Sequence, residues 1–171
     1  MEIMFSVAIL GVVFAAVSHL MAPAAGFFRD GLARQQANNE ARSCMNTIGT
    51  AMRAGLANSV RLSTPNTTPV VPWSRIDFNL PLSAPLASGT TSYTFSLVNH
   101  AVQMTEYVPP HTLLGPRTLA SNVTKLMFVP VDSRDPSLFI VSLRIDAPLG
   151  NSGQTFTTIE LNQEIHMQVN Y

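Results

Sequence analysis

The feature that most constrains this chain lies at its N-terminal end, where residues 3–28 contain no Asp, Glu, Lys or Arg. As an α-helix this run would be about 39 Å long, at roughly 1.5 Å per residue. The hydrocarbon core of a bilayer is about 30 Å thick. We therefore expect residues 1–28 to form one hydrophobic helix that is long enough to span a membrane.

Composition excludes several classes of protein. Only 12% of the 171 residues are charged, and the formal net charge is zero. This balance argues against a nucleic-acid binder that works by bulk electrostatics and against an acidic disordered tail. The single cysteine, Cys44, excludes an intrachain disulfide and a CxxC pair. We expect Cys44 to be a buried, inert thiol rather than a nucleophile.

Beyond Phe28 the charged residues return, and the apolar residues change to a helical spacing. Residues 41, 45, 48, 52 and 56 are Ala, Met, Ile, Met and Leu, three or four positions apart. This spacing predicts an amphipathic helix over residues 29–62, with one face packed against a domain. Repeated prolines between residues 63 and 90 exclude a long regular helix there and predict an extended connector.

The remaining residues alternate between apolar and polar side chains, which is typical of strands. The alternation is clearest at residues 93–97, 139–145, 158–161 and 165–169, and residues 123–131 are rich in strand-forming residues. Turn residues occur at 132–136 and 150–153, and Pro130 indicates a sheet edge or a strand end. The predicted fold is α+β: a long N-terminal stem helix, apolar in its first half, packed on one C-terminal antiparallel β-sheet within residues 63–171.

We find no arrangement of residues in the sequence that indicates catalysis. The four histidines lack metal-ligand spacing, and neither a GxSxG motif nor a P-loop is present. Asp132 and Asp135, with Ser133 between them, could supply oxygen ligands to calcium, but Asp-Ser-x-Asp-Pro is also a common turn. We therefore expect neither an enzyme nor a cofactor, and calcium at Asp132 and Asp135 is kept only as an alternative.

Glu2 is the acidic residue at the head of the apolar run. A carboxylate there is costly in lipid and usually has a partner, although the helix dipole would also favour it in interfacial water. The segment Met1–Gly11, MEIMFSVAILG, resembles the N-terminal methylation motif of type IV pilins and pseudopilins. In that motif a glycine, a processed phenylalanine and a short apolar stretch precede a glutamate and a long apolar helix.

Three residues carry the resemblance. Glu2 matches the family's glutamate, Gly11 matches a glycine nine residues further on, and Pro23 lies four residues beyond the family's helix-bending proline. The usual place of that proline is taken by His19. The leader and the processed phenylalanine of the motif are missing, and we expect Met1 to be an internal methionine of a Phe-x-x-Met-Glu start.

The resemblance implies a structural subunit of a type IV pilus-like or pseudopilus filament that polymerises through its N-terminal helix. In that family the glutamate pairs with the amino terminus of a neighbouring subunit, so Glu2, Gly11 and Pro23 are the expected assembly residues. The stretch from 11 to 23 is the candidate for a non-helical segment in the filament. The C-terminal strands also resemble those of the larger minor pilins and J-type pseudopilins.

The resemblance also implies a location and partners. The chain would be a single-pass inner-membrane protein before assembly and part of a periplasmic or extracellular filament afterwards. Its partners would be copies of itself or other pilins, the inner membrane, an assembly platform and a prepilin peptidase, with no nucleic acid.

Alternative interpretations of the stem remain open. It could be a cleavable secretory signal, although Glu2 stands where basic residues are expected, or a plain anchor. The rival function is a membrane-anchored periplasmic binding module whose sheet holds a ligand.

Overall fold

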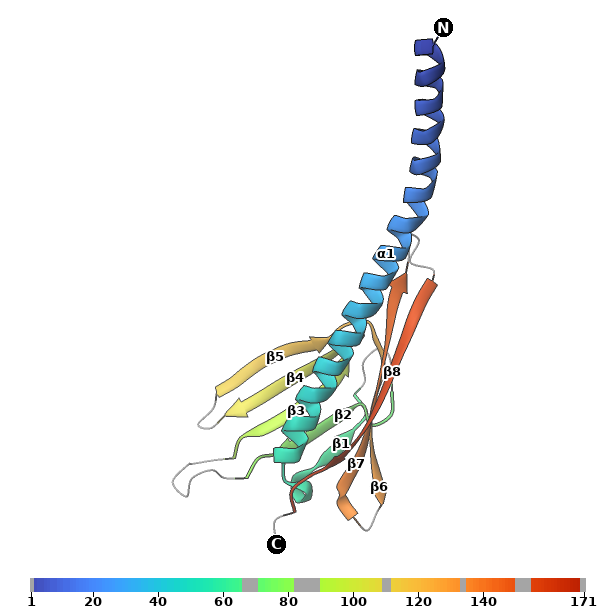
Figure 1. Ribbon diagram of the computed structural model, residues 1–171. Coiled ribbons are helices and arrows are strands. Elements are labelled where there is room, and N and C mark those ends of the chain that lie inside the picture. Colours follow the sequence, from blue (N-terminus) through green and yellow to red (C-terminus); the bar gives the residue numbers. More distant parts are fainter. Residues whose placement is uncertain are drawn as a thin grey trace.

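The computed structural model describes residues 2–65, 71–81, 90–108, 112–132, 135–149 and 155–169. A single long helix, α1 (Glu2–Ala54), precedes two antiparallel β-sheets. Figure 1 shows that the N-terminal half of α1 projects away from the sheets, while its C-terminal half lies against them. The expected α+β class with a long N-terminal helix is confirmed.

The sheets follow one another along the chain. The five-stranded sheet has the order β1-β2-β3-β4-β5, and the three-stranded sheet has the order β6-β7-β8. The bounds are β1 (Arg61–Ser63), β2 (Arg75–Asn79), β3 (Ser92–Val98), β4 (Ala101–Val108), β5 (Thr112–Ala120), β6 (Val123–Asp132), β7 (Asp135–Leu149) and β8 (Thr155–His166). A short 3₁₀ helix, η1 (Ala57–Ser59), joins α1 to β1.

We expected one sheet, and the division into two is a correction. The chain changes sheet between β5 and β6, at Asn122, whose φ of 55° turns the backbone sharply. The carbonyl of Asn122 then accepts a hydrogen bond from the backbone N–H of Asp146 in β7, at 3.0 Å. Alternating residues predict a strand, but they do not say which sheet the strand joins.

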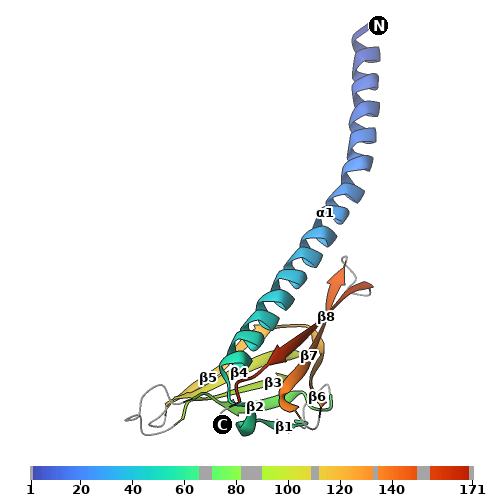
Figure 2. The ribbon, with the colours of Figure 1, turned by 60° about the horizontal axis from the view of Figure 1, so that its bottom comes forward.

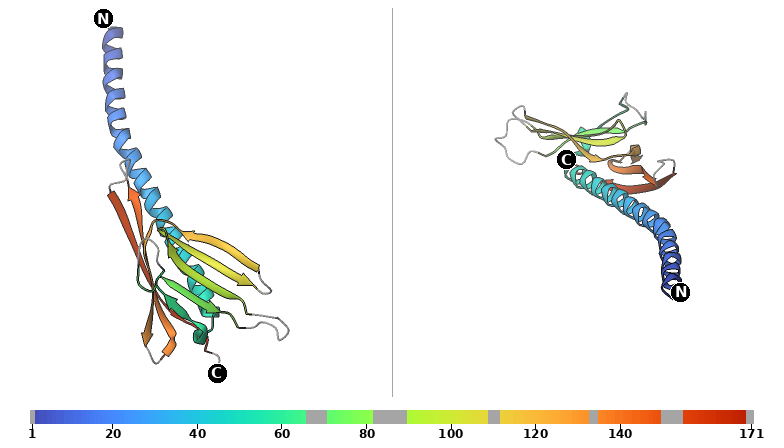
Figure 3. Two further views of the ribbon diagram at one scale, coloured as in Figure 1. Left: turned by 180° about the vertical axis from the view of Figure 1, so that it is seen from behind. Right: turned by 90° about the horizontal axis from the view of Figure 1, so that it is seen from above.

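The predicted buried face of the helix is largely confirmed. Ala41, Met45, Ile48 and Met52 are all buried, whereas Leu56 is half-buried and lies beyond the helix. This face packs on β7, β8 and β5, and Figure 3 shows α1 on one side of the two sheets. The core continues between the sheets through large buried side chains, which include Phe78, Phe95, Phe128 and Leu143.

α1 ends at Ala54 rather than near residue 62, because the backbone finds other partners there. The N–H of Leu56 donates to the carbonyl of Asn79, and the carbonyl of Gly55 accepts from the N–H of Gln168. A Cβ on Gly55 would lie only 2.4 Å from Cδ2 of Phe78. A glycine is therefore required where the chain leaves the helix and passes close to the core.

Several strands differ from the sequence-based expectations. The predicted strand at 158–161 is the middle of the longer β8, and 165–169 contributes its end and an isolated bridge. β1, β2, β4 and β5 were not predicted, and β2 lies inside the expected Pro-rich connector. Pro130 lies in β6, which is an edge strand of its sheet, as predicted.

Candidate membrane and assembly surface

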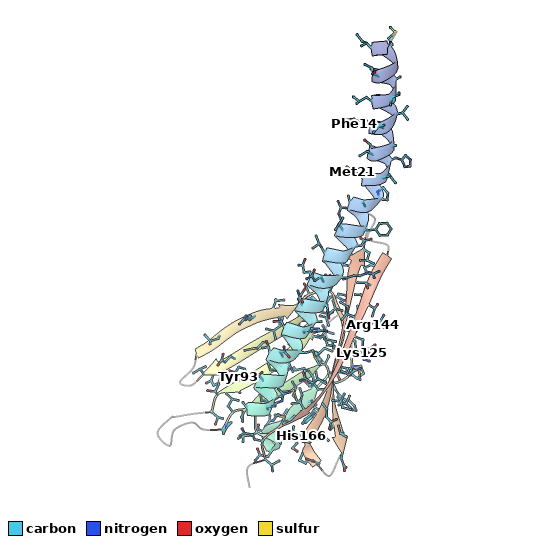
Figure 4. All side chains as sticks on the ribbon, viewed as in Figure 1. Phe14, Met21, Tyr93, Lys125, Arg144 and His166 are labelled. Atoms are coloured by element: carbon cyan, nitrogen blue, oxygen red, sulfur yellow. The ribbon has the colours of Figure 1, made fainter. Side chains whose placement is uncertain are left out.

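The N-terminal half of α1 is an extended apolar surface. Its most apolar 18-residue window has a mean hydropathy of 2.0, and none of it is buried inside the chain. Phe14 and Met21 are 71% and 67% exposed, and Figure 4 shows both on the part of α1 that projects away from the sheets. A soluble monomer rarely exposes an apolar surface this large, so a partner or a lipid phase must cover it.

The apolar surface surrounds the helix instead of forming a stripe. Val12, Val13 and Phe14 are consecutive residues, each turned by about 100° from the last, and all three are more than half exposed. A helix that is apolar on every side is stable when every side is covered. By length and composition α1 can cross a membrane once.

The structure places the three predicted assembly residues at separate levels of this helix. Glu2 begins α1, and its side chain lies outside the described part of the chain. Gly11 follows about 13 Å further along the axis. A Cβ built on Gly11 meets nothing within 4 Å, so the surface there is open to a neighbour. These residues therefore do not form a single pocket.

Pro23 lies inside α1, and the helix continues through it. Because proline has no backbone N–H, residue 23 cannot donate a hydrogen bond to the carbonyl of His19. Figure 4 shows that α1 bends shortly after Met21, which is where a proline is expected to kink a helix. Residues 11–23 are helical here. Their proposed unwinding concerns the assembled filament and stays a prediction.

The C-terminal half of α1 is attached to the sheets by polar contacts as well as by its buried face. Oε1 of Glu40 accepts hydrogen bonds from the backbone N–H of Ser121 at 2.6 Å and from its hydroxyl at 2.8 Å. Ser121 lies in the turn where the chain passes from one sheet to the other. This link, which the sequence did not suggest, ties the helix to the junction of the two sheets.

Cys44 lies on the buried face of α1 and is 1% exposed. Burial, together with the negative charge of Glu40, raises the pKa of the Cys44 thiol to about 12. The thiol is therefore protonated at neutral pH and unreactive. The expected burial of this cysteine is confirmed.

The calcium candidates lie at the end of the β6–β7 pair. Asp132 and Asp135 are register partners there, and Ser133 lies outside the described residues. Oδ1 of Asp135 accepts hydrogen bonds from the hydroxyl and the backbone N–H of Ser137, which lower the pKa of Asp135. One oxygen of Asp135 is thus already used in a local turn. In the described part of the chain, no group of three His, Cys, Asp or Glu residues could hold a metal.

A second feature is an open groove of about 480 Å³ between α1 and the five-stranded sheet. Its walls are Asn46, Thr47, Thr50, Ala51 and Ala54 on the helix and Leu80, Tyr93 and Met104 on the sheet side. The hydroxyl of Tyr93 donates to Glu106 at 3.1 Å. Burial, followed by this hydrogen bond and the charge of Glu106, raises the pKa of Tyr93. The groove has the size of a small-ligand site.

Comparison with known proteins gives no family assignment. No protein-family model matches the chain, and no curated protein matches its sequence. The function is therefore argued from the stem, the groove and the N-terminal motif.

Sequence reasoning also missed Phe156, a half-exposed aromatic residue at the start of β8. The available signal was a lone aromatic residue directly after the polar stretch 150–155.

Proposed function

We propose that this chain is a structural subunit of a type IV pilus-like or pseudopilus filament. The observation that supports it is that one continuous helix has two halves of different character. Its first half is apolar and exposed on every side, and its second half carries a folded head. Lipid tails and a bundle of like helices are two environments that match such a surface. The motif carried by Glu2 and Gly11 favours a subunit that passes from the first environment to the second.

In the proposed cycle the stem first spans the inner membrane once, and the stems then form the apolar core of a polymer. The transfer costs little hydrophobic free energy, since lipid tails and packed apolar side chains are similarly apolar. The head stays in water, because its outer face carries the ion pairs Lys125–Glu160 and Arg144–Asp146, whose cations are labelled in Figure 4. The driving ATPase, platform and leader peptidase are separate proteins.

Glu2 sets the register between subunits in this proposal. A carboxylate among packed helices is strongly destabilising unless a positive group neutralises it. The amino terminus of a neighbouring subunit can do so at one axial offset only. Other offsets leave a buried charge unpaired, so the stems pack in a single register.

The test is electron microscopy of filaments sheared from cells, with the subunit identified by mass spectrometry. We expect filaments that contain this chain, and we expect Glu2→Ala to abolish or sharply reduce them. Glu2→Asp is the matched control, because it keeps the charge and should retain filaments. Absence of the chain from filaments, or normal assembly of Glu2→Ala, would contradict the proposal.

The groove beside Tyr93 favours a second candidate, a membrane-anchored periplasmic binding module in which α1 is only a tether. The upstream reading frame separates the two. A short basic leader that ends in glycine and phenylalanine, in frame before Met1, is expected for the pilin-like subunit. A start codon without such a leader is expected for the anchored module.

A further inference from the structure

Among the strands that the structure describes, β7 and β8 reach furthest towards the N-terminal half of α1. Twelve register pairs join the two strands, from Leu138↔His166 to Leu149↔Thr155. Figures 1 and 2 both show this end of the hairpin beside the middle of α1, beyond the other strands. At that end Leu149 is 8% exposed, so its side chain is covered.

The level of the hairpin end on the helix follows from strand and helix geometry. A Cβ on Gly49 would lie 3.2 Å from the side chain of Gln163, so these two residues are at one level. From Gln163 back to Phe156 the strand covers about 23 Å, which corresponds to about 15 residues of α-helix. Phe156 therefore lies near the level of residue 34, within about one turn of Leu32.

The outer face of the hairpin changes character along its length. Arg144, Asp146 and Glu160 make this face charged in the middle, and both arginine and glutamate take part in ion pairs there. Pro148 is the next residue after Asp146 on this face of β7, and its register partner in β8 is Phe156. Both residues are exposed. In the described part of the hairpin the charged face is thus followed by a small apolar patch, Pro148 and Phe156, which we call the tip, and Phe156 alone is 58% exposed.

α1 changes from apolar to charged residues at the level of the hairpin end. Phe27, Phe28 and Leu32 are 78%, 76% and 66% exposed, and Arg29 is the first charged residue after the apolar run. Residues 27–34 span about 10 Å of helix. The polar layer on each side of a bilayer is about 5–8 Å thick. Apolar side chains such as Phe and Leu on segments that lie in the membrane interface are buried about 5–10 Å into the boundary between headgroups and acyl chains.

We propose that Phe156 and Pro148 insert into the polar headgroup layer of the same membrane that α1 spans. The partner that covers this apolar tip is phospholipid. The proposal rests on the membrane-inserted stage of the proposed function and does not depend on later polymerisation. Two contacts with one bilayer, the stem and the tip, fix the tilt and the rotation of the head above the membrane.

Depth-dependent fluorescence quenching of the full-length chain tests this contact. The chain has a single tryptophan, so Trp73→Phe gives a background without one. In that background Phe156→Trp reports on the tip and Phe14→Trp on the middle of the stem. Ile140→Trp is the matched control, because it lies on the same outer face about 26 Å down the hairpin from Pro148. Vesicles of phosphatidylethanolamine and phosphatidylglycerol carry bromine either near the headgroup or deep in the acyl chain.

The expected result is loss of Phe156→Trp emission with shallow bromine, loss of Phe14→Trp emission with deep bromine, and no loss for Ile140→Trp. Quenching of Phe14→Trp while Phe156→Trp stays as bright as Ile140→Trp would overturn the contact but keep the membrane span. If neither Phe14→Trp nor Phe156→Trp is quenched, both the headgroup contact and the membrane span are overturned. Pro148→Trp is a second reporter of the tip if Phe156→Trp lowers the yield of folded protein.

Discussion

Replacement of Gly55 by alanine should destabilise the attachment of the head to the stem. An added Cβ would lie 2.4 and 2.7 Å from two ring carbons of Phe78 and 2.9 Å from Cε of Met167. Carbon atoms in contact are normally about 3.5–4.0 Å apart. Phe78 is 1% exposed and is stacked on Phe95 with ring centroids 6.1 Å apart, so its ring has little room to move.

The expected cost of this overpacking is about 1–3 kcal/mol in the free energy of unfolding. For a chain of this size each kcal/mol corresponds to about 2–4 °C in Tm. The assay is thermal unfolding of the full-length chain in detergent micelles, followed by near-ultraviolet circular dichroism. The Gly55→Ala variant should unfold roughly 2–12 °C below the original chain.

Gly31→Ala is the matched control. A Cβ on Gly31 meets nothing within 4 Å, and alanine is favoured over glycine in a helix by about 1 kcal/mol. Its Tm should therefore be unchanged or higher. If Gly55→Ala has the Tm of Gly31→Ala, the close approach to Phe78 does not constrain residue 55, and the reasoning fails.

Three further predictions concern titratable groups. With a pKa of about 12, the Cys44 thiol should resist iodoacetamide at pH 8 in the folded chain and react once it is denatured. Glu106→Gln should lower the raised pKa of Tyr93, measured as an earlier ultraviolet absorbance change on alkaline titration. The hydrogen bonds from Ser137 lower the pKa of Asp135 below 3.8, so they stabilise the fold above that pH, and the effect is lost as the pH falls through the folded value. Ser137→Ala should move this pKa towards 3.8 in an NMR titration.

Periodicity predicted the parts of the fold that bury one face. The stripe from Ala41 to Met52 was predicted because a helix on a sheet must hide one side, and those residues are buried. The strand expected at 93–97 is β3, and that at 139–145 is the middle of β7. In β7 the inward residues are buried and the outward ones are more exposed, and in β3 Phe95 and Leu97 are buried between half-buried neighbours, which keeps the alternation visible in the sequence.

The strands that were missed lack such a clear pattern. Nearly every residue of β4 is half-buried, so its two faces do not differ enough to show alternation. β5 contains Gly115 and Pro116, residues that are uncommon inside strands. In β2 Ile76 and Phe78 do alternate with polar residues, but the surrounding prolines favoured a connector over a strand.

The candidate site was predicted only as far as it lies along one helix. Glu2, Gly11 and Pro23 were identified from a motif, and the structure adds their spacing on α1 without testing their roles. The level of Phe156 was not predictable. It depends on the length of β7 and β8 and on their course beside α1, and no local pattern around residue 156 encodes either.

The continuity of α1 limits how the head can be placed relative to a membrane. The helix has 53 residues and is about 80 Å long, and it passes from the apolar run into the packed stripe without a linker. A rigid helix carries its orientation from the lipid into the head, whereas a flexible linker would lose it. The one proline inside α1, Pro23, lies within the apolar run and before the first charged residue, Arg29. Bending at Pro23 would therefore redirect the part of α1 before Pro23, while the part after Pro23 and the β7–β8 hairpin keep their relation at the membrane surface.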